Sequence, residues 1–193
     1  KISIVNHSYS IDIDTNGLCK FSSSFICVGR LSEQKGIIQL LDIFSRYPKA
    51  NITFVGSGVL EPLVKEYVAK YSNIKYLGFI KGLNNLIPVY KQHSFVVLNS
   101  IKTPIWEELF GMALYEGMAC GCVPLANSHP GPKEIITDNV DGFLCEETHI
   151  EDLINKALRM DSKDYNEMRK NAIRRGQSYN CSKIADKWKD IFD

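Results

Sequence analysis

Two glutamates, Glu108 and Glu116, bracket a glycine and an apolar run in the segment EELFGMALYEG. If a helix begins near Phe110, Glu108 lies in the loop before it and Glu116 lies about two turns inside it. Gly111 then lets backbone N–H groups approach an anion at the positive end of this helix. Because carboxylates accept hydrogen bonds from sugar hydroxyls and a helix N-terminus neutralises a pyrophosphate, the pattern is typical of a nucleotide-sugar site. Paired glutamates near a helix start also suit the helix dipole alone, and this segment by itself leaves both interpretations open.

Two cations follow an earlier apolar run, in the segment VGRLSEQKG. Arg30 lies in the loop after the run, and Lys35 lies at the start of the following helical pattern. Two cations beside helix N–H groups form a pyrophosphate site, whereas two solvated side chains are the alternative. A second glycine turn, Gly56-Ser57-Gly58, lacks the G-x-G-x-x-G spacing, and no acidic residue ends the strand before it. A dinucleotide site is therefore poorly supported.

Apolar runs and helical patterns alternate along the chain and must position these side chains. We predict strands at 25–28, 51–55, 74–77, 95–98, 122–126 and 142–145, because each is a short and nearly continuous apolar run. We predict helices at 35–47, near Pro62, at 88–91, at 110–119 and from Ile150 onward. Six such strands predict an α/β fold: a doubly wound, Rossmann-like parallel sheet with helices on both faces. Its ligand is expected beyond the carboxyl ends of the strands, where the strand order reverses.

The composition fits one compact domain and excludes several classes of function. The 193 residues are 45% hydrophobic and 23% charged, and their net charge of +1 gives no argument for a nucleic-acid partner. No apolar run is long enough to span a bilayer, and the first residues lack the layout of a signal peptide. The six cysteines lack zinc-site spacing, so we interpret them as free thiols of a cytoplasmic protein.

The chain begins without Met and enters directly into a strand-like run, which suggests a piece of a longer protein. We interpret residues 1–23 as a linker that leaves a preceding domain, and residues 24–193 as a Rossmann-like domain with C-terminal helices. Asp12-Ile13-Asp14 resembles a D-x-D metal motif, but it lies in this linker, so we predict no metal site. His129 either approaches the ligand or is an ordinary loop histidine, and the second interpretation is favoured.

In this order the segments resemble the C-terminal, nucleotide-sugar-binding domain of GT-B glycosyltransferases of the retaining GT4 family. The resemblance runs from about Phe25 to Leu144, and its most diagnostic part is the pair Glu108 and Glu116 with Met118-Ala119-Cys120-Gly121 after it. The other markers are Val28-Gly29-Arg30-Leu31 with Lys35-Gly36, Val55-Gly56-Ser57-Gly58, Leu77-Gly78-Phe79-Ile80, Gly131-Pro132-Lys133-Glu134-Ile135-Ile136 and Asp141-Gly142-Phe143-Leu144.

The resemblance implies a role for each matching residue. Arg30 and Lys35 are the catalytic cations that bind the donor diphosphate and stabilise the leaving nucleotide. Glu108 is the catalytic carboxylate beside the donor sugar; the long loop after Ser100 leaves Glu107 as the alternative, although counting back from Gly111 favours Glu108. The rest of the implied donor-binding set is Gly29, Gly56, Ile80, Phe110, Gly111, Met112 and Glu116. Glu116 holds the ribose hydroxyls, the backbone near Ile80 contacts the base, and the backbone of 110–112 approaches the sugar and the phosphates.

The resemblance also implies the reaction, which is the transfer of a sugar, with retention, from a nucleoside-diphosphate sugar to a glycan or lipid-linked acceptor. UDP is the favoured nucleotide, and no cofactor or catalytic metal is implied beyond this donor. The N-terminal half that binds the acceptor is missing, so we expect the chain to bind donor and to transfer sugar poorly or not at all. Peripheral membrane association of the full-length protein is left open. The alternatives are a non-catalytic nucleotide- or anion-binding Rossmann module and an NAD-dependent oxidoreductase domain.

Overall fold

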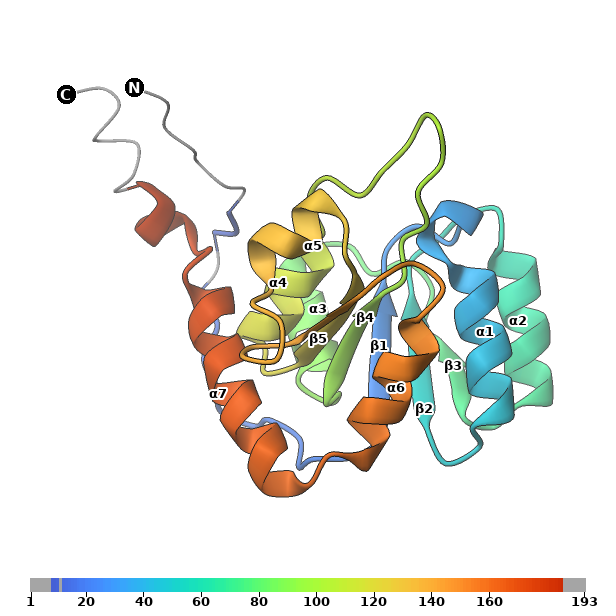
Figure 1. Cartoon of the computed structure of the whole chain (residues 1–193), viewed down its shortest axis with the longest axis horizontal. Coiled ribbons are helices and arrows are strands. Elements are labelled where there is room, and N and C mark those ends of the chain that lie inside the picture. Colours follow the sequence, from blue (N-terminus) through green and yellow to red (C-terminus); the bar gives the residue numbers. More distant parts are fainter. Residues whose placement is uncertain (1–7, 11, 186–193) are drawn as a thin grey trace.

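The computed structural model describes residues 8–10 and 12–185 and shows one sheet between two layers of helices (Figure 1). The strands are β1 (Ser24–Val28), β2 (Asn51–Val55), β3 (Ile74–Tyr76), β4 (Phe95–Leu98), β5 (Val123–Asn127) and β6 (Phe143–Cys145). The helices are the short 3-10 helix η1 (Glu33–Lys35), α1 (Ile37–Arg46), α2 (Glu61–Lys70), α3 (Leu83–Tyr90), α4 (Met112–Ala119), α5 (Pro130–Ile135), α6 (Ile150–Arg159) and α7 (Ser162–Gln177). The six predicted strands are confirmed, with ends that shift by no more than one residue.

The strands lie in the order β3-β2-β1-β4-β5-β6, and all neighbours are parallel. The order reverses between β1 and β4, because the chain first adds strands on one side of β1 and then returns to the other side. Loops that leave the carboxyl ends of these two strands turn in opposite directions and open a crevice between them. The predicted doubly wound fold is confirmed, and the crevice lies where a ligand was expected.

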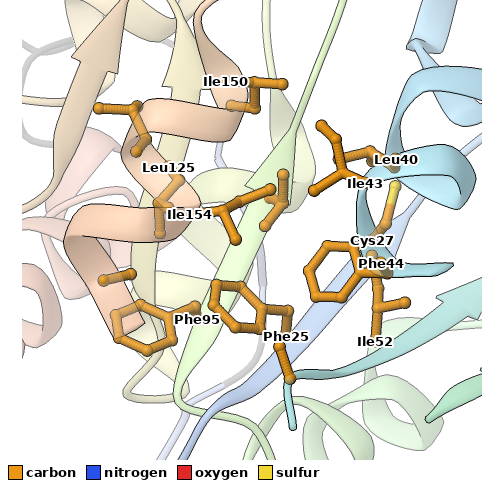
Figure 2. Packing of buried hydrophobic residues seen from close by; sticks show 14 of the residues in the cluster. Phe25, Cys27, Leu40, Ile43, Phe44, Ile52, Phe95, Leu125, Ile150 and Ile154 are labelled. Carbon is orange, nitrogen blue, oxygen red and sulfur yellow. The ribbon is translucent and has the colours of Figure 1, made fainter. Parts of the chain in front are cut away.

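Both faces of the sheet are buried, which explains why its strands are apolar along their whole length. Alternate residues face opposite layers, so Phe25 packs into one core cluster and Ile26 into the other. Figure 2 shows Phe25 between the rings of Phe44 and Phe95, whose centroids lie 5.1 and 4.9 Å away. Helices α1, α2 and α6 cover this face, and α3, α4 and α5 cover the other, while α7 contributes to both.

The predicted helix 35–47 is divided at Gly36, so that Lys35 ends η1 and α1 begins at Ile37. Gly36 has a φ of 61°, in the left-handed region that glycine adopts without strain. A Cβ at this position would lie 2.1 Å from the carbonyl oxygen of Asn99, which follows β4. The tight turn therefore brings the head of α1 against the end of β4 and fixes the position of Lys35 beside it.

Two other helix predictions need correction, and one helix was missed. The helix predicted at 88–91 begins at Leu83, because Pro88 lies inside α3 and not in its first turn. The helical pattern from Ile150 onward is broken before α7, where Asp161 caps the new helix by accepting two backbone hydrogen bonds. Helix α5 was not predicted, although Pro130 at its first position is a known helix-start signal.

The segment predicted as a linker packs closely on the domain in its described part. Tyr9 is buried and stacks on Tyr115 of α4, with ring centroids 6.0 Å apart. In the D-x-D motif, Asp14 pairs with Lys91 at 3.0 Å and Asp12 accepts a hydrogen bond from Asn180 at 3.0 Å. Both carboxylates are thus engaged by side chains outside the crevice. The domain boundary at 23 stays a prediction. The start of the predicted linker (1–7) and the end of the predicted domain (186–193) lie outside the described residues.

Within the described residues, no group of three or more His, Cys, Asp or Glu side chains is placed to hold a metal ion. Across the same part of the chain, no helix combines the length and the apolar character that a bilayer crossing needs.

Candidate functional site

A cavity of about 710 Å³ opens at the carboxyl ends of β1 and β4, where the strand order reverses. The loop between β4 and α4 rises above this edge of the sheet (the yellow-green segment at the top of Figure 1). The cavity brings together residues that are far apart in sequence, since Arg30 and Lys35 line it with Glu108 and Glu116. Gly29, Phe110, Gly111 and Met112 of the predicted set also line it.

The other two predicted residues, Gly56 and Ile80, line a neighbouring cavity of about 310 Å³. Val28, Gly29 and Arg30 border both cavities, so the two spaces adjoin each other at the end of β1. Gly56 has a φ of 140°, and a Cβ there would lie 1.8 Å from the carbonyl oxygen of Gly29. The two strand-end turns therefore approach each other only because position 56 has no side chain.

Lys35 and Glu108 form an ion pair inside the larger cavity. The Ser100 hydroxyl donates a hydrogen bond to the same carboxylate oxygen, Oε2, at 2.8 Å. Glu108 is only 6% exposed, and burial alone would raise its pKa. The hydrogen bond and charge of Lys35, together with Ser100 and the Phe110 backbone, outweigh burial and hold the pKa of Glu108 below its usual value. The pair is therefore a buried carboxylate held in its charged form by a cation.

The structure separates the two candidate glutamates by their partners. Glu107 pairs with Lys102 at 3.0 Å, and this hydrogen bond lowers its pKa. Glu107 also lies 3.4 Å from Nδ1 of His129, on the side of the loop that faces β5 and α5. Both glutamates border the cavity, but Glu108 is the one that contacts Lys35. The assignment of Glu108 as the glutamate beside the donor sugar stays a prediction.

Glu116 lies in the middle of α4, one turn and a half after Gly111. Burial raises its pKa to about 7, and a hydrogen bond of 3.2 Å from the Tyr90 hydroxyl opposes this shift. Burial and the charge of Glu116 raise the pKa of Tyr90 in turn, so the phenol stays protonated and donates the hydrogen bond to Glu116. Glu116 therefore titrates near neutral pH. Further hydrogen bonds donated to its carboxylate would lower this pKa and favour the charged form.

The N-terminus of α4 supplies the electropositive side of the cavity. Gly111 caps the helix with a φ of 77°, and Met112 and Ala113 of the first turn border the cavity. The first N–H groups of a helix have no intrahelical acceptor and carry its positive dipole end. Combined with Arg30 and Lys35, they can bind a polyanion, while Glu108 and Glu116 can accept hydrogen bonds from hydroxyl groups.

Sequence reasoning assigned no role to three residues that contact the predicted set. Ser100 binds Glu108, Tyr90 binds Glu116, and the Trp106 ring centroid lies 5.1 Å from the ammonium group of Lys35. For Ser100, a polar residue placed just after an apolar strand was an available signal. For Tyr90 and Trp106, the sequence carries no such signal, because their partners come from other elements.

Comparison with known proteins identifies what the chain is similar to. Residues 18–177 match the family described as glycosyl transferases group 1. An uncharacterized glycosyltransferase of Haemophilus influenzae is 28% identical over 91% of this chain and 51% of its own length. The UDP-Gal:alpha-D-GlcNAc-diphosphoundecaprenol alpha-1,3-galactosyltransferase of Escherichia coli is 29% identical over 91% of this chain and 46% of its own length. The chain thus spans about half the length of these relatives.

Among solved structures, the Anabaena protein HepE in complex with UDP and glucose superposes with a TM-score of 0.72 at 22% identity. The match covers 89% of this chain and 48% of HepE. At this level of identity the likeness concerns the fold, and it agrees with the doubly wound sheet described above.

Proposed function

The chain belongs to the glycosyl transferases group 1 family, and from this premise we propose that it is the donor-binding half of a GT-B glycosyltransferase. The proposed donor is a nucleoside-diphosphate sugar, with UDP as the nucleotide. The proposed acceptor is a glycan or a lipid-linked sugar, bound mainly by the half of the protein that lies outside this chain. The observation that carries the proposal is the cavity in which Lys35 pairs with Glu108 beside the N-terminus of α4.

The two cavities together offer the right chemistry for such a donor. In our proposal the diphosphate lies against Arg30, Lys35 and the first turn of α4, because these groups supply positive charge and N–H donors. The ribose hydroxyls donate to Glu116, and the sugar lies beside Glu108. The base occupies the smaller space near Gly56 and Ile80, whose lining also includes the apolar side chains of Val55 and Phe79.

In the proposed reaction, the bond between C1 of the sugar and the diphosphate oxygen breaks, and a bond from the acceptor hydroxyl oxygen to C1 forms. Negative charge builds on the departing diphosphate, so cations and N–H dipoles fixed beforehand stabilise the transition state more than the ground state. The acceptor oxygen attacks C1 on the face from which the diphosphate departs, which gives retention, and its proton passes to a diphosphate oxygen on that face. As negative charge grows on the departing diphosphate, the diphosphate attracts Lys35. The Ser100 hydroxyl continues to hold Glu108 when Lys35 shifts toward the diphosphate.

UDP is the nucleotide we favour, since the galactosyltransferase relative from Escherichia coli has UDP-Gal in its name and the HepE structure holds UDP. Isothermal titration of the 193-residue chain with UDP, UDP-glucose, GDP, ADP and NAD tests the choice. We expect UDP and UDP-glucose to bind and the other three to bind more weakly. Binding of NAD without binding of any nucleoside diphosphate would exclude a donor site and favour an oxidoreductase domain.

The backbone of α5 supports the donor site, and Gly131→Ala tests this support. The Gly131 N–H donates to the carbonyl oxygen of Glu108 at 3.2 Å, and a Cβ at position 131 would lie 2.5 Å from the Phe110 nitrogen. Because the added methyl must push residues 109–110 away, we expect UDP-glucose to bind about fivefold more weakly, as for the loss of about one hydrogen bond. Titration calorimetry measures the change.

Ser128→Ala is the matched control in the same loop, since it adds no atom and needs no backbone shift. An affinity of Gly131→Ala equal to that of this control would show that α5 does not support the site.

A further inference from the structure

Four polar side chains lie buried behind the donor cavity, at the carboxyl ends of β4 and β5. They are Asn99, Ser100, Asn127 and His129, each no more than 3% exposed. Buried polar groups hold fixed positions when their hydrogen bonds are satisfied, and they are costly when a partner is lost. The proposed function uses none of these four side chains except the Ser100 hydroxyl, so the purpose of the others is open.

One branch of this network leads from His129 to Glu108. Nε2 of His129 lies 2.7 Å from the carbonyl oxygen of Ser100, which also accepts a hydrogen bond from the Asn127 side chain at 2.7 Å. Ser100 in turn donates its hydroxyl proton to Glu108 at 2.8 Å. The carbonyl and the hydroxyl belong to one residue, so holding the first fixes the backbone from which the second projects toward Glu108.

A second branch leads from Asn127 to the turn that carries Lys35. The Asn127 amide donates to Oδ1 of Asn99 at 3.0 Å, and the Asn99 amide donates to the Gly36 carbonyl at 3.2 Å. Gly36 follows Lys35 directly and forms the tight turn described above. The buried network thus meets both members of the Lys35–Glu108 pair, one through Ser100 and the other through Asn99.

His129 has a second face toward the loop after β4. Its Nδ1 atom lies 3.4 Å from Glu107, which pairs with Lys102. On the side of Ser100, Nε2 also lies 3.4 Å from Glu147, in the loop after β6. The imidazole is therefore inserted between β5 and the loop that carries both glutamates. With 2% of its surface exposed, its side chain lies behind this loop, where a donor in the cavity does not reach it.

We propose that His129 is a positioning residue for the donor site: its hydrogen bond to the Ser100 carbonyl fixes the hydroxyl that holds Glu108 beside Lys35. This inference rests on the function proposed for the Lys35–Glu108 pair. It assigns a purpose to a buried histidine in a loop and gives that histidine no contact with substrate.

Two conservative variants distinguish the role of Nε2 of His129 from that of Nδ1. The glutamine amide in His129→Gln reaches about as far as Nε2 and can donate to Ser100, whereas the asparagine amide in His129→Asn reaches only as far as Nδ1. Both variants remove the same titratable group. We expect UDP-glucose to bind about fivefold more weakly to His129→Asn and within about twofold of the unmodified chain to His129→Gln. His129 is the N-cap of α5, where asparagine is favoured, so His129→Asn is expected to fold.

A double-mutant cycle shows whether the effect passes through Ser100. Ser100→Ala removes the hydroxyl that binds Glu108, so adding His129→Asn to it should change affinity by less than about twofold. Equal losses in the two His129 variants, or losses that simply add to that of Ser100→Ala, would overturn the proposal. Failure of the unmodified chain to bind any nucleoside-diphosphate sugar would instead contradict the proposed function and, with it, this inference.

Discussion

Lys35→Ala is expected to lower the affinity of the chain for UDP-glucose by about a hundredfold, since it removes a charge-assisted contact worth about 2–3 kcal/mol. The substitution also leaves the carboxylate of Glu108 without its cation, next to the proposed position of the diphosphate. Repulsion between these two anions adds to the loss. Titration calorimetry of the chain measures it, and an affinity within about twofold of the unmodified chain would remove Lys35 from the site.

The matched control for this variant is Lys65→Ala. Lys65 also pairs with a glutamate, at 2.7 Å, but on the exposed surface of α2, where such pairs contribute little. We expect Lys65→Ala to leave both affinity and stability close to those of the unmodified chain.

A double variant distinguishes two effects of Lys35→Ala: the loss of a contact with the donor and the loss of the cation that neutralises the buried Glu108. Without Lys35, burial dominates and raises the pKa of Glu108, so Lys35→Ala should destabilise the chain at pH 7 by about 3 kcal/mol. This loss shrinks as the pH falls toward 4.5, because the buried carboxyl then takes up a proton. Lys35→Ala with Glu108→Gln should restore stability at pH 7, measured by urea unfolding, and should recover only the part of the affinity that repulsion by Glu108 removes. Recovery of the full affinity in the double variant would show that Lys35 serves only to neutralise Glu108.

Glu116→Gln is expected to have opposite effects on stability and on donor binding. Burial raises the pKa of Glu116 from 4.5 to about 7, so the folded chain retains a proton there that the unfolded chain has lost. This contribution to stability is complete below pH 4.5, declines between pH 4.5 and 7, and is absent above pH 7. Glutamine stays neutral and still accepts from Tyr90, so the variant should be about 3 kcal/mol more stable than the unmodified chain at pH 8.

The same carboxyl should make donor binding depend on pH. If the ribose hydroxyls donate to the charged form, binding lowers the pKa of Glu116, and affinity rises as the pH increases toward 7. We expect UDP-glucose to bind about tenfold more weakly at pH 6 than at pH 8. UDP-glucose is preferred here to UDP, whose terminal phosphate titrates near pH 6.

Glu116→Gln should bind UDP-glucose more weakly at pH 8 and with little change across this range. Glu61→Gln, at the start of α2 and outside the lining of both cavities, should keep the behaviour of the unmodified chain. A pH dependence that persists in Glu116→Gln would place the titrating group elsewhere.

The fold follows from local features of the sequence. Each strand is a continuous apolar run because it is buried on both faces, and this property is visible in the residues themselves. Helices with one apolar stripe, such as α1 and α6, were equally visible. The helix boundaries were harder to predict where the local signal is ambiguous. Pro88 is compatible with a helix start and with a helix interior, and only the folded structure shows that it lies inside α3.

The sequence by itself determined the residue types of the candidate site: a cation after the first strand, a second cation before a glycine turn, and two glutamates around the start of a helix. Tertiary structure decided which of these groups meet. Lys35 reaches the loop after β4, where it pairs with Glu108, because the tight turn at Gly36 rests on the end of β4, and β4 lies next to β1 only in the folded sheet. Burial decided the charge of Glu116, since a raised pKa comes from the elements packed around a carboxyl and not from its neighbours in the chain.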